Sequence, residues 1–354
     1  MKVLISGVCG FVGSSVARYL IEHDSAIEVA GFDNFIRAGS EINRRSLQTL
    51  GVRVSHADLR SQSDLEALPA ADWVIDAAAN ASVLAGVDGR TSSRQIVEHN
   101  LSGTVQMLEF CKTHRAGITL LSTSRVYSIA SLAAVPMRVE NDAFSPDESG
   151  VLPQGVTAAG LSEIFSTAPP VSLYGTTKLC SEQLALEYGE AFDFPVWINR
   201  CGVLAGAGQF GRADQGIFSF WIHSWLRRRP LKYIGFNGTG HQVRDCLHPH
   251  DLARLVLKQL RHPSRNLDRV QHVAGGASRA MSLKQLSAWC GQRIGQHEIS
   301  AESSERAFDI PWMVMDSSRA ERQWGWHPEI SMDAILEEIA AHATQHPDWL
   351  EITT

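Results

Sequence analysis

Several features that mark particular classes of protein are scarce in this sequence. The six cysteines are scattered without a CxxC pair, so neither a disulfide framework nor a zinc site is predicted, and we expect buried free thiols in a reducing cytoplasm. Uninterrupted apolar runs stay shorter than the roughly 18 residues that a membrane-spanning helix needs. No Lys/Arg-rich stretch dominates and the net charge is −6, which argues against a nucleic-acid partner. An apolar strand pattern from residue 2 leaves no room for a signal peptide, so a cytoplasmic protein is expected.

Three glycines near the start of the chain are the most informative feature that is present. Gly7, Gly10 and Gly13 follow an apolar run of strand length and precede a helical pattern that opens with Phe11 and Val12. In a dinucleotide-binding turn, the first glycine allows the tight turn and the second lets backbone N–H groups approach a pyrophosphate. The third lets the helix pack on the strand. The pattern predicts a dinucleotide site, with an ordinary glycine-rich turn as the alternative.

An acidic residue follows at the distance that such a site requires. Asp33 and Asn34 end a second apolar strand, about 20 positions after the glycine turn, where the adenosine ribose would sit. A carboxylate there accepts hydrogen bonds from both ribose hydroxyls and repels a 2′-phosphate. This favours NAD over NADP, although the nearby Arg37 could pair with a 2′-phosphate.

Strand and helix patterns alternate through the first half of the chain, which predicts an α/β protein with a doubly wound parallel Rossmann sheet. The expected strands are residues 3–6, 29–32, 52–55, 73–77, 118–122 and 195–199. The expected helices are residues 11–22, 43–50, 63–68, 92–115 and 178–192. Ligands then lie beyond the carboxyl ends of the strands.

The second half predicts a smaller, mixed lobe that binds substrate. Alternation is lost after about residue 200, although residues 218–228, 283–294 and 332–342 have helical patterns. We assign residues 1–200 and 241–262 to the cofactor domain, and residues 201–240 and 263–354 to the substrate-binding lobe. The stretch 130–172 is rich in Pro, Ser, Gly and Ala, as lids and binding loops are, but whether it closes over substrate stays open.

A tyrosine and a lysine four residues apart suggest acid–base chemistry. Tyr174 and Lys178 lie one turn apart on one face of the expected helix. A cation roughly 4–6 Å away would stabilise the phenolate and lower the tyrosine pKa, and bound NAD would add to this effect. Tyr174 could then take a proton from a substrate hydroxyl. The alternative is a tyrosine that packs on a lysine stem.

Three hydroxyl residues follow the strand expected at residues 118–122. Ser122, Thr123 and Ser124 would face the crevice at the carboxyl end of that strand. A hydroxyl there can bind the reacting hydroxyl of a substrate and orient it toward Tyr174. A strand-end turn that satisfies its own backbone is the alternative.

Together these motifs resemble the extended short-chain dehydrogenase/reductase family. The likeness extends almost over the whole chain and includes the segments Gly7–Gly13, Asp33–Asn34, Asp58–Arg60, Ala77–Ala79, Asn100, Ser122–Tyr127, Tyr174–Lys178, Arg244–Asp251 and Gly325–Pro328. That family consists mainly of NAD(P)-dependent nucleotide-sugar epimerases and dehydratases. Within it, the segments Phe32–Gly39, Asp214–Gly216 and Gly240–His248 resemble CDP-paratose 2-epimerases, also called CDP-tyvelose epimerases.

The resemblance implies roles for particular residues. Tyr174 is similar to the general base, Lys178 to its activator and ribose ligand, and Thr123 to the hydroxyl that orients substrate. The implied cofactor contacts are Gly7, Gly10, Phe11, Val12, Gly13, Asp33, Asn34, Arg37, Asp58, Leu59, Ala77, Ala78, Ala79, Asn100, Ser122, Tyr174 and Lys178. The implied substrate contacts are Asn80, Ser124, Gln215 and Arg244, the last of which resembles the arginine that pairs with a diphosphate. A surface ion pair of Arg244 with Asp245 is the alternative.

Residues that depart from the family pattern restrict the reactions that this chain is expected to catalyse. Dehydratases carry Asp-Glu directly after the threonine, whereas Ser124 and Arg125 stand here, which disfavours water elimination. Many relatives carry His where Asp76 stands, and a polar residue near Val203. We therefore predict an NAD-dependent epimerase that oxidises a nucleotide sugar to a keto-sugar and reduces it on the opposite face, at C2 of a CDP-deoxysugar.

Two other functions remain open from the sequence. One is a 4-epimerase or 4-reductase on a UDP-, CDP- or GDP-sugar, and the other is a non-catalytic NAD(P) sensor. The Tyr174/Lys178 pair argues against the sensor. The resemblance also implies a homodimer through the helices expected within residues 92–115 and 179–192. No metal ion is predicted.

Overall fold

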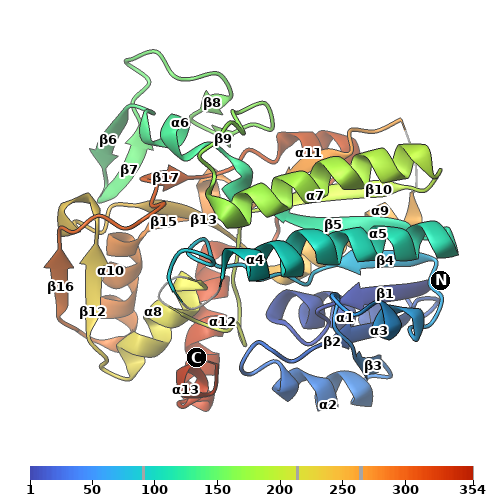
Figure 1. Ribbon diagram of the computed structural model, residues 1–354. Coiled ribbons are helices and arrows are strands. Elements are labelled where there is room, and N and C mark those ends of the chain that lie inside the picture. The colour runs from blue at the N-terminus through green and yellow to red at the C-terminus, as the bar shows by residue number, and fades with distance from the viewer. Residues whose placement is uncertain (90–91, 213–214, 263–265, 354) are drawn as a thin grey trace.

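A computed structural model describes residues 1–89, 92–212, 215–262 and 266–353. Its centre is a parallel sheet of seven strands in the order β14-β10-β5-β4-β1-β2-β3 (Figure 1). The strands are β1 (Lys2–Ser6), β2 (Glu28–Asp33), β3 (Arg53–His56), β4 (Trp73–Asp76), β5 (Gly117–Thr123), β10 (Val196–Cys201) and β14 (Val270–Val273). The predicted doubly wound Rossmann sheet is confirmed.

Helices cover both faces of this sheet because alternate side chains of each buried strand point to opposite faces. One face packs against α1 (Phe11–His23), α2 (Glu41–Thr49), α9 (Pro249–Arg261) and α11 (Ser318–Trp324). The other packs against α3 (Gln62–Glu66), α5 (Gly103–His114) and α7 (Ser172–Ala191). Val3 and Ile5 of β1 belong to the first core and Leu4 to the second. No helix in the described ranges is long and apolar enough to cross a membrane.

The helix expected at residues 92–115 is three consecutive pieces. They are α4 (Ser93–Ile96), the π-helix η1 (Val97–Ser102) and α5. Ser92 caps α4, since its side chain accepts from the Gln95 backbone N–H and the Gln95 side chain accepts from Ser92. A π-turn in a helix is often found at a functional site. Here it carries Asn100.

A smaller lobe packs beside the carboxyl ends of the central strands (Figure 1). Its helices are α8 (Ile217–Leu226), α10 (Leu283–Ile294), α12 (Met332–Gln345) and α13 (Trp349–Thr353). Its strands are β11 (Val203–Leu204), β12 (Leu231–Ile234), β13 (Val243–Leu247), β15 (Ala280–Ser282), β16 (Ile299–Glu302) and β17 (Trp312–Met313), joined by short 3₁₀ turns at Phe236–Gly238 and Ala277–Arg279. β13 pairs with β11, β15 and β17.

The inserted stretch before α7 forms its own small elements. They are a 3₁₀ turn at Ser124–Val126, α6 (Ile129–Ala133) and the hairpins β6 (Met137–Glu140) with β7 (Ala143–Pro146) and β8 (Val156–Thr157) with β9 (Gly160–Leu161). Leu132, Val156 and Phe165 share a hydrophobic core with Trp312 and Met313 of β17. The insert therefore packs against the smaller lobe.

Two strands pair with the domain to which the sequence analysis did not assign them. β14 falls within residues 263–354, assigned to the substrate-binding lobe, but pairs with β10 in the central sheet. β13 falls within residues 241–262, assigned to the cofactor domain, but pairs with strands of the smaller lobe. No strand was predicted at β14 because it carries Gln271 and His272, which are polar yet fully buried. The division into two domains stays a prediction.

Candidate active site

One large cavity, of about 640 Å³, lies between the strand ends and the smaller lobe. Every residue predicted from the sequence to bind cofactor or substrate or to act in catalysis lines it, except Asn100. No residue between 126 and 173 lines it. Of the segments that resemble CDP-paratose 2-epimerases, Asp214 lies outside the described residues.

The glycine turn forms the floor of the cofactor end. Gly7 has φ +63°, and a Cβ there would lie 2.9 Å from Cα of Ala78. A Cβ on Gly13 would lie 2.3 Å from the Gly7 carbonyl oxygen. α1 begins at Phe11, and no side chain caps its N-terminus. Its first N–H groups therefore suit an anionic ligand.

The acidic residue after β2 is placed beside this turn. Asp33 is buried, and its carboxylate accepts from the backbone N–H of Cys9 (3.1 Å) and of Phe35 (2.9 Å). Burial raises the pKa of Asp33, and the backbone donors oppose that rise. Each oxygen keeps a lone pair for a ribose hydroxyl. Arg37 donates to the Phe210 carbonyl and packs over its ring.

Asp58 also lines the cofactor end of the cavity. Its carboxylate accepts from Asn34 (3.0 Å) and forms an ion pair with Arg60 (2.7 Å), so the pKa of Asp58 lies well below its usual range. Leu59 lies beside it on the cavity wall.

Asn100 does not touch the cavity but holds a segment that does. Its side chain accepts from the Asn80 N–H (2.8 Å) and donates to the Asn80 carbonyl oxygen (3.0 Å). It also donates to Thr177 of α7 (3.3 Å). Asn100 thereby joins the segment 77–80 to the helix that carries Tyr174 and Lys178.

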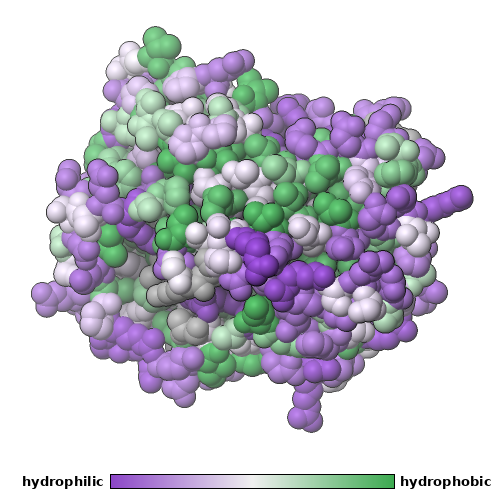
Figure 2. Space-filling view, in the orientation of Figure 1, coloured by the Kyte–Doolittle hydropathy of each residue, from purple (hydrophilic) through white to green (hydrophobic). Residues whose placement is uncertain are grey.

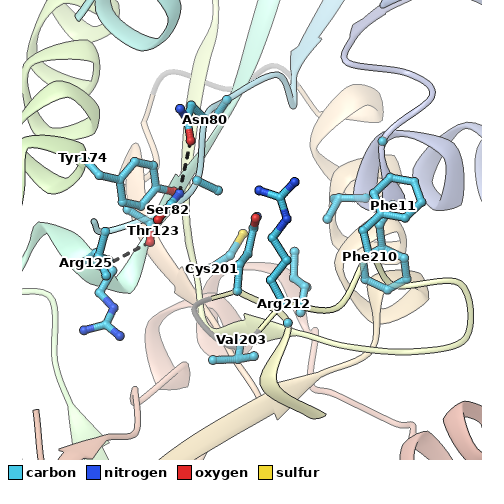
Figure 3. A pocket seen from close by; sticks show the side chains of 18 of the residues that line it. Phe11, Asn80, Ser82, Thr123, Arg125, Tyr174, Cys201, Val203, Phe210 and Arg212 are labelled. Atoms are coloured by element: carbon cyan, nitrogen blue, oxygen red, sulfur yellow. Dashed lines mark hydrogen bonds between the residues drawn. The ribbon is translucent and has the colours of Figure 1, made fainter. Parts of the chain in front are cut away.

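Tyr174 and Thr123 lie side by side on one wall (Figure 3). Lys178 follows Tyr174 one turn later on α7 and is only 2% exposed. The predicted lowering of the Tyr174 pKa is wrong for the chain alone. Burial raises it to about 12, against the opposing effects of Thr123 and Arg125. The cost of burying a phenolate exceeds those stabilising effects.

The residues before and after Thr123 in the sequence have different surroundings. The Ser122 hydroxyl donates to the buried Glu182 of α7, so it faces that helix. Ser124 is buried and lines the cavity. Asn80, above Thr123 in Figure 3, accepts from the Ser82 N–H with its side-chain oxygen (3.5 Å).

Arginines dominate the far end of the cavity. Arg244 pairs with Asp309 (3.1 Å), not with Asp245 as the alternative proposed, because successive residues of β13 point to opposite sides. Arg125 donates to the Phe308 carbonyl oxygen (3.4 Å), and burial lowers its pKa to about 10, with Arg244 contributing. Arg306 also lines this end. The cations outnumber the carboxylate there, which suits a diphosphate.

Several lining residues were not predicted from the sequence. Those at the substrate end include Arg125, Gln242, Arg306, Phe308 and Asp309. Arg306–Asp309 belongs to an irregular segment without periodicity, so no pattern marked it. Gln215 was predicted, and its backbone N–H donates to the Arg212 carbonyl oxygen (3.2 Å).

One cysteine is exposed, although buried thiols were predicted from the sequence. Cys180 is exposed, whereas the other five cysteines are buried. It lies on α7, two residues after the buried Lys178 and therefore on the solvent-facing side of the helix.

The cofactor end fits NAD. A turn without room for side chains lies at the start of α1, and a carboxylate lies at the end of β2. These are the features that hold a pyrophosphate and an adenosine ribose.

Comparisons with known proteins agree with this geometry. The model of the NAD dependent epimerase/dehydratase family matches residues 3–274. CDP-paratose 2-epimerase of Salmonella typhi is 25% identical over 353 residues, covering 94% of this chain and 96% of that protein. UDP-glucuronate 4-epimerase of Thermodesulfobacterium geofontis is 24% identical over 346 residues, covering 94% and 93%.

A solved structure shows the same fold. UDP-glucuronic acid 4-epimerase from Bacillus cereus, in complex with UDP-glucuronic acid and NAD, superposes with a TM-score of 0.76 at 24% identity, covering 98% of this chain and 99% of that one. The family match, the sheet order and the cofactor end of the cavity lead to one conclusion: this chain belongs to the NAD dependent epimerase/dehydratase family, and its cofactor is NAD.

Proposed function

We propose that this chain is a nucleotide-sugar epimerase that oxidises a ring carbon of its substrate to a ketone and reduces it again on the opposite face. The observation that carries the proposal is that Tyr174 and Thr123 lie side by side on a cavity wall that also holds Lys178. Lining arginines at the far end support a diphosphate-linked substrate.

Each residue of the site has a separate role in this reaction. NAD, when bound, supplies the hydride acceptor and donor and a positive charge beside Tyr174. Thr123 holds the reacting hydroxyl of the sugar, and Tyr174 takes its proton and later returns it. Arg244 and Arg306 hold the diphosphate while the keto-sugar turns over. Because Ser124 and Arg125 follow Thr123, no carboxylate stands where elimination would need one.

Two substrates have comparable support. Similarity to CDP-paratose 2-epimerase favours C2 of a CDP-deoxysugar, and similarity to UDP-glucuronate 4-epimerase favours C4 of a UDP-sugar. A 4-reductase differs from both because it consumes reduced cofactor. We also propose a cytoplasmic homodimer through the helical stretch α4–η1–α5 and through α7. The exposure of Val97 and Phe192 supports that surface, and Figure 2 shows apolar side chains over α7.

The deciding experiment incubates the purified chain with CDP-, UDP-, GDP- and dTDP-sugars in deuterated buffer and follows them by NMR. Inversion at one carbon without solvent deuterium would support the proposal and identify the substrate. Deuterium at the inverted carbon would indicate a proton-transfer route instead. Net reduction would identify a reductase, and no turnover with any sugar would favour the sensor. A scattering mass equal to one 38.8 kDa chain would exclude the dimer.

A further inference from the structure

The smaller lobe touches the cofactor end of the cavity directly at Phe210. This residue lies between β11 and α8, lines the cavity and is only 6% exposed. Arg37, which follows β2 and also lines the cavity, donates to the Phe210 carbonyl oxygen (3.3 Å). Its guanidinium carbon lies 5.8 Å from the centre of the phenyl ring, an attractive arrangement. Figure 3 shows Phe210 on the side of the cavity where Phe11 lies, away from Tyr174.

A second contact joins the same two parts of the molecule. Gly39 has φ +88°, and a Cβ there would lie 2.6 Å from Cγ2 of Thr353 in α13 and 3.4 Å from Cε1 of Phe210. The segment that follows β2 therefore packs closely against both α13 and Phe210. Asp33 at the end of β2 stands where the adenosine ribose of a dinucleotide binds. The contact between the lobes thus lies next to the adenosine half of the cofactor.

Two helices of the smaller lobe hold Phe210 in place. The Trp349 ring of α13 lies 5.9 Å from the Phe210 ring, and its indole N–H donates to the Gln209 carbonyl oxygen (2.9 Å). The Ser219 hydroxyl of α8 donates to the same oxygen (3.0 Å). Both hydrogen bonds are buried, so a shift of the segment 209–210 would leave polar groups unpaired, at a cost in free energy. The fold of the smaller lobe therefore fixes Phe210 against Arg37.

We propose that Phe210 is a positioning residue that retains NAD: with Arg37 it closes the adenosine side of the cavity over the bound cofactor. Release of NAD then requires the contact between the two lobes to open, so a change that weakens this contact speeds release. Retention suits the epimerisation proposed above, in which one cofactor molecule accepts and returns the hydride. It depends only on the NAD site, whichever sugar reacts there.

The test measures how fast the full chain, loaded with radiolabelled NAD, releases it into excess unlabelled NAD without any sugar. Phe210→Ala removes the ring over which Arg37 packs. We expect release to be roughly tenfold faster, the factor that corresponds to a desolvated cation–π contact. The matched control is Phe144→Ala, which removes a ring that packs on Phe236 and His241 away from this cavity. It should leave the release rate unchanged.

A double-mutant cycle shows whether Phe210 acts together with Arg37. In an Arg37→Met background, Phe210→Ala should speed release much less than in the wild-type chain. Phe210→Leu, which fills most of the space without a ring face, replaces Phe210→Ala if the latter does not fold. An unchanged release rate in the Phe210 variant, fully additive effects, or an equal acceleration by Phe144→Ala would overturn the inference. A wild-type chain that retains NAD but turns over no sugar would refute the proposed function alone.

Discussion

The two ends of the cavity are built in different ways. The cofactor end consists of turns that follow neighbouring strands of one sheet, and its critical contacts involve backbone atoms, as at Gly7 and Gly13. The substrate end collects side chains from segments far apart in the sequence, such as Arg125, Arg244 and Asp309. Binding at the first end depends on close backbone approach, and binding at the second depends on charged side chains. Variants should therefore separate the two ends.

The largest effect is expected where the two ends meet. Tyr174→Phe removes the hydroxyl that accepts the substrate proton, and we expect kcat to fall by about 10³-fold, within the range of general acid–base catalysis. NAD content should be unchanged, since the phenyl ring still fills its place. The control is Tyr188→Phe on the same helix, whose hydroxyl donates to Glu109. A Tyr174→Phe chain that kept its turnover would disconnect this tyrosine from the chemistry.

The same contrast decides how much could be predicted from the sequence. The cofactor end could be predicted because backbone geometry demands glycine at fixed spacing and places Asp33 at a strand end. The Tyr174 and Lys178 pair followed from helical spacing. Arg306 and Asp309 could not be predicted because their segment has no period and meets Arg244 only through the fold. β14 was missed because its buried Gln271 is paired with Asn199 and Trp324, which the sequence does not reveal.

The pH dependence of the free energy of unfolding should distinguish a carboxylate of the smaller lobe from one at the cofactor end. Asp245, in the smaller lobe, is fully buried, and burial raises its pKa to about 6. The folded state then binds the proton more tightly than the unfolded state. Protonated Asp245 therefore contributes roughly 3 kcal/mol to the free energy of unfolding. This contribution is complete below about pH 4 and is lost as the pH rises to 6. Asp245→Asn should remove this slope in denaturant unfolding curves.

Asp58 at the cofactor end should behave in the opposite sense. Its pKa is lowered by Arg60, so its contribution is present above about pH 4 and is lost at lower pH. The pair is partly exposed and the effect should stay below about 1 kcal/mol. If the free energy of unfolding changed with pH in the same way in Asp58→Asn and Asp245→Asn, the opposite environments assigned to the two carboxylates would be refuted.

A methyl group in the glycine turn should affect the cofactor end alone. In Gly13→Ala the new Cβ would lie 2.3 Å from the Gly7 carbonyl oxygen, and backbone must move to make room. We expect a loss of about 2 kcal/mol in the free energy of unfolding, together with weaker NAD binding. For the loss of stability, the matched control is Gly10→Ala, because its Cβ would lie 3.2 Å from the same oxygen. Comparable destabilisation by both would show that Gly13 is not the tight position.

Arg244→Met should affect the substrate end alone. Arg244 lines the cavity at an end where the arginines outnumber Asp309, so its removal should weaken nucleotide-sugar binding about tenfold, close to 1.4 kcal/mol. We expect this as a rise in KM, with NAD content unchanged. Arg60→Met removes a partly exposed arginine at the other end and should leave KM for the sugar unaltered. If Arg244→Met released NAD, the two ends would be coupled through the Arg244–Asp309 pair and could no longer be treated as separate binding surfaces.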